Sequence, residues 1–359
     1  MGNPTRRLRS VAAAFAALLP ATLLLGSGPA GAWDRGEVET FAVLPAGTPM
    51  IEGLTVGRDG NVYVTTFNPT ATSGNALLFV FNDDGELLRQ VTIQGSSPAT
   101  LGLAFHPTTH ILLVVDFGAG NVRSVDPTSG ASSVCITVTS PPAAPGLNAL
   151  TFDAAGNTYI SDSFNGIIWK KSGAGCGAAT AWVGPDPLLQ PHGVPPFGAN
   201  GLQFNKHETA LFVANTADDL LVKIPVSGGT PGTPAPFTYS INGADGIVLD
   251  RDDNIWVAAN QADEIVVVDP TGKAIAKLGD FDGVKNGVTR GLLFPASPDF
   301  SKDGKWLFVT NLELDLRSIG GPQTVDSQWA AQVRQHSIAK LRARIPPFPP
   351  KCFVRFVDE

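Results

Sequence analysis

The fold is decided by residues 244–273, ADGIVLDRDDNIWVAANQADEIVVVDPTGK. An apolar strand begins at Asp245-Gly246-Ile247, a second one contains Ile255-Trp256-Val257, and a third runs from Glu264 to Val268. Polar turns rich in Asp, Asn and Gly separate these β-branched and aromatic segments. This alternation is typical of consecutive antiparallel strands joined by tight turns.

The pattern that begins this stretch recurs six times along the chain. Each copy has a variable residue, a small residue and an apolar strand, and successive copies lie 45 to 52 residues apart. The copies are Glu52-Gly53-Leu54, Leu101-Gly102-Leu103, Asn148-Ala149-Leu150, Asn200-Gly201-Leu202, Asp245-Gly246-Ile247 and Arg290-Gly291-Leu292. Such intervals hold four short strands, the size of one propeller blade. The sequence therefore predicts an all-β fold, a six-bladed β-propeller with four antiparallel strands per blade. A pair of β-sandwiches is the alternative, which six regular copies disfavour.

The last repeat is one strand short. After Arg290 we expect strands at Leu292–Pro295, Trp306–Thr310 and Ser337–Leu341. The N-terminal segment Val38–Leu44 is apolar enough to supply the fourth strand. This pairing would close the ring and leave no open sheet edge.

The two ends of the chain differ from the repeats. Three arginines precede an apolar run over 11–25, and Ala30-Gly31-Ala32 offers a small-residue cleavage site. This layout predicts a signal peptide over residues 1–32 and an exported protein, periplasmic or secreted. An uncleaved N-terminal anchor is the alternative. The propeller then spans residues 33–344, and residues 345–359 form a Pro-rich tail.

Net charge and hydropathy restrict the partners. Cleavage would remove three of the 25 basic residues and no acidic residue, so the mature charge is 22 minus 32, or −10. An acidic surface repels phosphate backbones, so we expect no nucleic-acid partner. No later stretch is long and apolar enough for stable membrane insertion. The expected partner is a small-molecule substrate, and the sequence indicates no particular protein partner.

The three cysteines are Cys135, Cys176 and Cys352, and no two of them form a CxxC pair. A thiolate zinc site is therefore not expected. In an exported protein two cysteines can pair, and we expect a bond between Cys135 and Cys176. Three unpaired thiols are the alternative.

In a propeller the first strand of each blade lines the central channel. The residue before each small residue then lies at one mouth, which places six side chains in a ring: Glu52, Leu101, Asn148, Asn200, Asp245 and Arg290. Two carboxylates and two amides are hard oxygen donors that suit Ca²⁺, Mg²⁺ or Mn²⁺. The alternative is that these side chains hydrogen-bond to one another and to water in the channel.

The motifs Glu52-Gly53, Asn200-Gly201-Leu202 and Asp245-Gly246 resemble those of the senescence-marker-protein / gluconolactonase / luciferin-regenerating-enzyme family of regucalcin-like six-bladed propellers. The resemblance covers nearly all of the mature chain. It implies a divalent cation, most often Ca²⁺, held by Glu52, Asn200 and Asp245, with Asn148 facing the substrate. Members that hydrolyse sugar lactones tend to carry an Arg where this chain has Gly146, so the resemblance does not extend to a sugar acid lactone.

The resemblance favours a metal-dependent hydrolase of a small lactone or ester. In this hypothesis the cation polarises the carbonyl, and Asp245 or Glu52 accepts a proton from the attacking water. Asn148, Arg290 and His192 are the candidate substrate-binding residues. No Gly-x-Ser-x-Gly motif, phosphate loop or dinucleotide fingerprint occurs in the sequence. The alternatives are a non-catalytic ligand- or protein-binding propeller, and a lyase or strictosidine-synthase-like enzyme on the same scaffold.

Two further features lie near the predicted mouth. The insertion Asn311–Gln335 contains a predicted short helix over 324–334, and it forms either a lid or a passive excursion. An Asn or Asp also follows the second strand of most repeats, for which we expect a role in turn stability. These residues are Asn68, Asp162, Asn215, Asn260 and Asn311.

Overall fold

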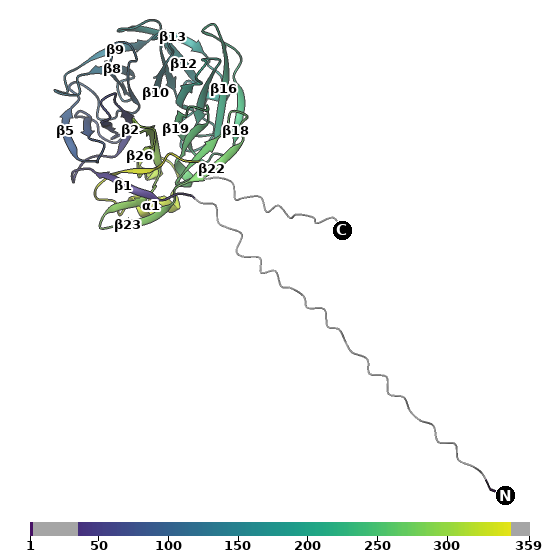
Figure 1. The fold of residues 1–359 in the computed structure, drawn as a ribbon. Helices are drawn as coiled ribbons and strands as arrows, with labels where there is room; N and C mark the ends of the chain where they lie inside the picture. The colour runs from purple at the N-terminus through teal and green to yellow at the C-terminus, as the bar shows by residue number, and fades with distance from the viewer. Residues whose placement is uncertain (3–34, 346–359) are drawn as a thin grey trace. The chain divides into compact units, whose positions relative to one another are not determined.

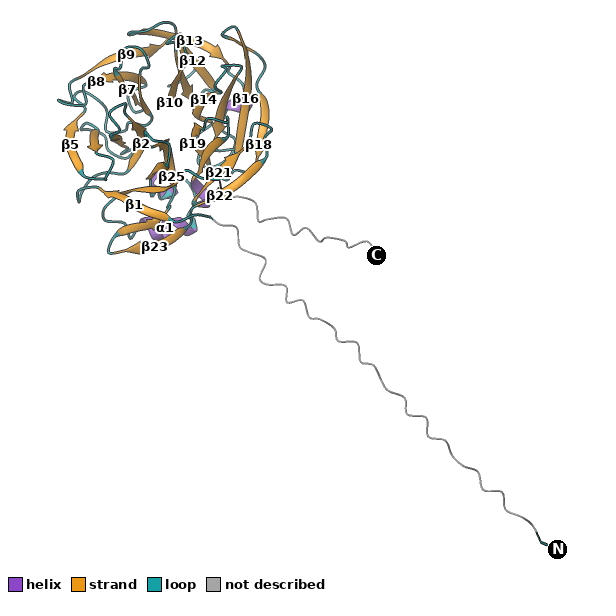
Figure 2. Ribbon diagram, viewed as in Figure 1, coloured by secondary structure: helices purple, strands orange, loops and turns teal. Residues whose placement is uncertain are grey.

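The structure is a computed structural model that describes residues 1–2 and 35–345. Nearly all of the predicted signal peptide, the tail beyond Ile345 and Cys352 lie outside the described residues. The described chain consists mostly of strands, which confirms the predicted all-β class (Figure 2). Its helices are α1 (Val325–Ala330) and the short 3-10 helices η1 (Pro187–Leu189), η2 (Asn260–Ala262) and η3 (Leu316–Ile319). In this part of the chain no helix has the length and apolar character that crossing a bilayer requires.

The strands form a series of curled sheets in which consecutive strands pair antiparallel (Figure 1). Consecutive strands pair in the units β2–β5, β6–β9, β10–β13 and β19–β22, and β14–β16 are joined by β17 and β18. The bounds are β1 (Val38–Val43), β2 (Ile51–Val56), β3 (Val62–Thr66), β4 (Leu77–Phe81), β5 (Leu87–Thr92), β6 (Leu103–Phe105), β7 (Leu112–Asp116), β8 (Asn121–Val125), β9 (Ser132–Val138), β10 (Leu147–Phe152), β11 (Thr158–Asp162), β12 (Ile167–Lys171), β13 (Gly177–Val183), β14 (Ala199–Phe204), β15 (Ala210–Asn215), β16 (Leu220–Ser227), β17 (Thr230–Pro231), β18 (Ala235–Tyr239), β19 (Ala244–Leu249), β20 (Ile255–Ala259), β21 (Glu264–Val268), β22 (Ala274–Leu278), β23 (Phe281–Lys285), β24 (Val288–Gly291), β25 (Pro295–Phe300), β26 (Trp306–Asn311) and β27 (Ser337–Arg342).

The N-terminal strand completes the last sheet, as predicted. β1 pairs antiparallel with β27, with Val38 opposite Leu341 and Val43 opposite Ser337. The strand order of this sheet is β1-β27-β26-β25. One ladder therefore joins the two ends of the repeat array, and it leaves no free edge between them.

The first strand of this last sheet begins later than predicted. The predicted strand is Leu292–Pro295, directly after Arg290, whereas β25 begins at Pro295. Residues 281–291 form the antiparallel hairpin β23–β24, which is an insertion in this repeat. The regular step from Asp245 therefore led to Arg290, which lies in the inserted hairpin and not in the first strand of the last sheet. Ala296 occupies the ladder position that Asp245 has in β19, so the prediction for Arg290 was wrong.

The first strands of the successive units surround a common centre. β2 contacts β6, β6 contacts β10, and the series continues through β14, β19 and β25 back to β2. Small residues permit this close approach. A Cβ atom on Gly53 would lie 2.1 Å from the carbonyl oxygen of Leu101, and one on Gly246 would lie 2.5 Å from that of Ala296. The small residue in each motif is therefore a packing requirement of the ring.

Hydroxyl groups next to the second strands tie neighbouring inner strands together. Thr216 donates a hydrogen bond to the carbonyl oxygen of Ala244 at 2.7 Å. Thr310 donates to the carbonyl oxygen of Glu52 at 2.6 Å, across the junction between the last sheet and the first. These bonds fix the backbone segments that carry the motif residues.

The hydrophobic core lies between adjacent sheets. One cluster joins Tyr159 and Ile168 of the β10–β13 sheet to Leu211 and Val222 of the following sheet. The second strand of a sheet is covered on both faces, and all five residues of β20 are buried. This double burial explains why these strands are continuous apolar runs.

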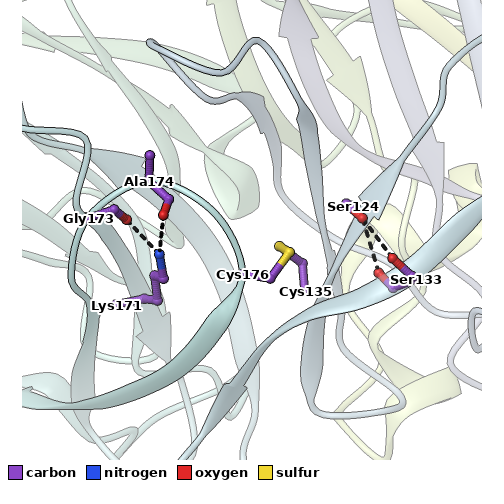
Figure 3. The surroundings of a disulfide bond; sticks show 7 residues. All are labelled: Ser124, Ser133, Cys135, Lys171, Gly173, Ala174 and Cys176. Carbon is purple, nitrogen blue, oxygen red and sulfur yellow. Dashed lines mark hydrogen bonds between the residues drawn. A yellow bond between two sulfur atoms is a disulfide. The ribbon is translucent and has the colours of Figure 1, made fainter.

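A disulfide bond links the outer strands of the units β6–β9 and β10–β13, which β9 and β13 join into one eight-stranded sheet (Figure 3). Cys135 on β9 is bonded to Cys176, which immediately precedes β13, and β13 runs parallel to β9. The Lys171 ammonium donates hydrogen bonds to the carbonyl oxygens of Gly173 and Ala174, and so closes the turn that carries Cys176. The expected pairing of Cys135 with Cys176 is confirmed.

Candidate functional site

A small cavity lies at the mouth of the ring where the motifs begin. Its volume is about 30 Å³, which is room for an ion or a water molecule. Two carboxylates, three amides, one hydroxyl and several apolar side chains line it. They are Glu52, Asp245, Asn148, Asn200, Asn260, Thr216, Phe67, Leu101, Pro195, Phe197, Phe294, Leu312 and Leu314. No Lys, Arg or His of the described chain lines this cavity.

The two carboxylates are buried in equivalent positions of β2 and β19. Glu52 is 5 % exposed and Asp245 is 4 % exposed. Burial raises the pKa of Glu52 well above its ordinary value of 4.5, and the charge of Asp245 raises it further. Burial also raises the pKa of Asp245 to about 7, and hydrogen bonds from Asn260 and Asn200 offset only part of that rise. Burial disfavours the charged form of each carboxylate, and the two negative charges repel each other. Glu52 and Asp245 therefore favour the binding of a proton or of a cation.

Two asparagines are held by hydroxyl groups behind them. The Nδ2 atom of Asn148 donates to Oγ of Ser163 at 3.2 Å. The Nδ2 atom of Asn200 donates to Oγ1 of Thr216 at 2.9 Å. Because the amide nitrogens are committed to these partners, the amide groups are fixed in orientation.

Asn260 is a site residue, although its sequence position predicted a role in turn stability. It is the first residue of η2, is 2 % exposed and lines the cavity. Its Nδ2 atom donates to Oδ2 of Asp245 at 3.1 Å and holds that carboxylate in place. The sequence signal was available, because Asn260 directly follows the second strand of the repeat that begins at Asp245.

Four oxygens in the cavity are buried without a hydrogen-bond partner: Oε2 of Glu52, Oδ1 of Asn148, Oδ1 of Asp245 and Oδ1 of Asn260. Each such acceptor costs about 1–3 kcal/mol when it is left unsatisfied. A divalent cation that prefers hard oxygen ligands satisfies several of them at once. In the described part of the chain no three His, Cys, Asp or Glu residues form a metal-binding group. The donor set that fits a cation is therefore two carboxylates completed by amides.

The structure brings together Glu52, Asn148, Asn200 and Asp245, all predicted from the repeat. Leu101, the apolar member of the predicted ring, also lines the cavity. The equivalent position in the last sheet is Ala296, which supplies no polar group.

Arg290 and His192, predicted to bind substrate, do not line the cavity. Arg290 is exposed on β24, and its guanidinium lies 3.5 Å from the hydroxyl of Thr40. The inserted hairpin carries it away from the ring. The His192 side chain is 59 % exposed, and its Nδ1 atom pairs with the carboxylate of Asp218 at 2.8 Å.

The insertion that follows β26 covers one side of the cavity. Leu312 and Leu314 line the cavity and are buried with other apolar residues. Glu313 lies between them with a positive φ of 55°, and its carboxylate accepts hydrogen bonds from Thr289 and His336. The predicted helix of this insertion is present as α1. The start of the insertion is thus part of the cavity wall.

A family model described as the SMP-30/Gluconolactonase/LRE-like region matches residues 96–279. The chain belongs to this family. The matched residues extend from the second repeat through the fifth and include Asn148, Asn200, Asp245 and Asn260. The predicted resemblance is therefore confirmed. A search of curated protein sequences finds no match.

Solved structures confirm the fold of this SMP-30/gluconolactonase-like chain. The calcium-binding protein regucalcin from Agrobacterium tumefaciens has a TM-score of 0.56 at 18 % identity, over 86 % of this chain and 98 % of that one. A gluconolactonase from Xanthomonas campestris has a TM-score of 0.57 at 13 % identity, over 86 % and 91 %. A streptogramin B lyase has a TM-score of 0.56 at 12 % identity, over 86 % and 98 %. At these identities the likeness concerns the fold alone, and proteins of this fold include hydrolases and lyases.

Proposed function

We propose that this protein is a six-bladed β-propeller enzyme that hydrolyses a small lactone or ester with a divalent cation. The observation that carries the proposal is the group of four unpartnered buried oxygens around one cavity. The family, whose description includes gluconolactonase, supports the reaction class. Ca²⁺ is the first choice because mixed carboxylate and amide oxygens suit it, and Mg²⁺ and Mn²⁺ are the alternatives.

Glu52, Asn200 and Asp245 would hold the cation, and the oxygens of Asn148 and Asn260 face the same cavity. When bound, the cation supplies positive charge that polarises a lactone or ester carbonyl. The carboxylates of Glu52 and Asp245 are the cavity groups able to accept a proton from the attacking water. Asn260 orients Asp245 through its hydrogen bond, and Asn148 is placed to orient the substrate.

One observation favours a second candidate, a propeller that binds a cation without turnover. Phe67, Leu101, Phe294, Leu312 and Leu314 cover a cavity of only about 30 Å³. A lactone enters it only if this apolar cover moves. If the cover stays closed, the cation has a structural role, since it neutralises the buried carboxylates.

Cation binding and hydrolysis must be measured separately to test the proposal. Calorimetric titration of the chelator-treated protein with CaCl₂ should show one bound ion in the wild type and none in Glu52→Gln. A panel of lactones and esters is then assayed with and without Ca²⁺. Calcium-dependent hydrolysis that Glu52→Gln abolishes supports the enzyme. Binding without hydrolysis of any substrate supports the second candidate. Absence of binding of Ca²⁺, and of Mg²⁺ and Mn²⁺ titrated in the same way, overturns both.

We also propose that the protein is exported, to the periplasm or outside the cell. The predicted leader supports this location. The Cys135–Cys176 disulfide supports it independently, because such bonds persist in oxidising compartments. Expression of the full chain followed by N-terminal sequencing of the exported product tests it, and the expected mature end is Trp33.

A further inference from the structure

Four phenylalanine side chains from separate loops gather beside the cavity. The ring of Phe117 lies 6.0 Å from that of Phe67, 5.6 Å from that of Phe164 and 6.0 Å from that of Phe197, between centroids. Phe164 and Phe197 stack with their centroids 5.8 Å apart. Phe67 and Phe197 also line the cavity. The aromatic cluster is therefore continuous with the oxygen-lined site.

Part of this cluster faces solvent. Phe164 is 44 % exposed, and Phe117 and Phe197 are half-buried. Val194, in the loop that carries Phe197, is also 44 % exposed. A single exposed apolar side chain is ordinary, but a group of them beside a polar cavity is typical of a ligand site.

In the described part of the chain, the polar part of the site offers no positive side chain to an anionic ligand. Its charged residues are Glu52 and Asp245, and no cationic side chain of the described residues lines it. An anionic ligand would therefore find no cationic side chain to pair with.

Phe164 also closes the space around Gly146, at the start of β10. A Cβ atom on Gly146 would lie 2.6 Å from the Phe164 ring. A longer polar side chain at this position would have to displace the ring. The Phe164 ring therefore occupies the space that a side chain at Gly146 would need, two residues before Asn148.

We propose that the substrate is a neutral lactone or ester with an aromatic or similarly flat apolar group, which packs against Phe117, Phe164 and Phe197. The carbonyl would then point from this rim toward the cation that Glu52, Asn200 and Asp245 would hold. The lactone or ester part of this inference rests on the proposed function. The aromatic part rests on the phenylalanine cluster alone, so the two parts can fail separately.

Two six-membered lactones that differ in polarity test the inference on the calcium-loaded protein. Dihydrocoumarin carries a fused benzene ring, and D-glucono-1,5-lactone carries hydroxyl groups. After subtraction of uncatalysed hydrolysis, we expect kcat/KM to be at least about tenfold higher for dihydrocoumarin. Equal values, or a preference for the sugar lactone, overturn the aromatic inference and leave the hydrolase in place.

Binding of chroman, a ring ether that cannot be hydrolysed, separates ligand class from catalysis. We expect Phe164→Ala and Phe197→Ala each to weaken chroman binding roughly 3- to 10-fold and to raise KM for dihydrocoumarin, with Ca²⁺ binding unchanged. Tyr239→Ala is the matched control, because Tyr239 is 63 % exposed on β18 and is not part of the cluster. Chroman binding without turnover of either lactone overturns the hydrolase and keeps the aromatic ligand. Absence of chroman binding, or equal weakening by Tyr239→Ala, overturns the inference.

Discussion

The inner strands carry acids both at the end that faces the cavity, the near end, and at the opposite end, the far end. The hydrogen-bond partners of these acids differ between the two ends. At the far end, Asp153 follows β10 and accepts hydrogen bonds from Asn157 and from the Tyr159 hydroxyl. Burial alone would raise the pKa of Asp153, yet these bonds together hold it below its ordinary value. At the cavity, burial raises the pKa of Asp245 to about 7, and its Oδ1 atom has no partner.

The far-end arrangement repeats in other units. Asp59 accepts from Asn61 and Tyr63, and Asp250 accepts from Asn254 and Trp256. The near-end residues change from one unit to the next, as the ring from Glu52 to Ala296 shows. An acid whose environment recurs with the repeat stabilises the fold, whereas an acid that differs between repeats and lacks partners belongs to the site.

Removal of one site carboxylate is the strongest test of this contrast. Asp245→Asn keeps the size of the side chain and removes its charge. We expect Ca²⁺ affinity to fall at least about 100-fold and calcium-dependent hydrolysis to be lost, because one of the two charged ligands is gone. Calorimetry and the lactone assay measure these losses. Asp153→Asn is the control, and equal loss of Ca²⁺ binding in both variants would contradict the assignment.

The sequence located this carboxylate because its position follows from the repeat. Glu52, Asn148, Asn200 and Asp245 each precede a small residue, and that small residue is required where inner strands touch. The same rule failed for Arg290, since the β23–β24 insertion left the spacing regular while it moved the strand. Periodicity of a sequence does not reveal that a hairpin has been inserted within a repeat of ordinary length.

The pH dependence of stability should also distinguish the two ends. The pKa of Asp245 rises from 3.8 to about 7 on folding, so the folded state holds this proton more tightly than the unfolded state. The stability from this group is present below about pH 4 and is lost as pH rises through about 7. In chelator-treated protein we expect a loss of up to about 4 kcal/mol across this range. Urea unfolding at several pH values measures it.

The comparison between wild type and Asp245→Asn measures this contribution together with the effect of the Asp245 charge on the pKa of Glu52. Asp263 and Asp299 are half-buried acids whose pKa desolvation raises to about 7 and about 6, so they change the free energy of unfolding with pH in the same direction. The difference between the two profiles removes them. At pH 8, added Ca²⁺ should restore stability in the wild type only. Parallel profiles for the two proteins would show that Asp245 ionises freely in the folded state.

Truncation of a far-end acid should lower the free energy of unfolding and leave Ca²⁺ affinity unchanged, whereas Asp245→Asn should lower Ca²⁺ affinity. Asp153→Ala leaves the Tyr159 hydroxyl and the Asn157 amide without their acceptor. We expect the free energy of unfolding to fall by about 2 kcal/mol while Ca²⁺ affinity stays within about twofold of wild type. Chemical denaturation and calorimetry on the same sample give both values. A large loss of Ca²⁺ affinity with little loss of stability would instead assign Asp153 to the cation site.

Asn215 and Asn260 give the smallest and most specific contrast, because each follows its motif residue, Asn200 or Asp245, at the same distance in the sequence. In the ladders they differ by one residue, since Asn215 is level with Ala259 and Asn260 is level with Thr216. The sequence grouped them, since their shared signal is an Asn after the second strand. In the structure Asn215 donates to the carbonyl oxygens of Leu188 and Gln190, whereas Asn260 donates to Asp245. Asn260→Ala should therefore weaken Ca²⁺ binding about 10-fold, as removal of a group that orients a ligand does. Asn215→Ala should lower stability and leave Ca²⁺ affinity unchanged. Calorimetry on both variants decides the matter, because equal affinities would mean that Asn260, like Asn215, serves only the turn.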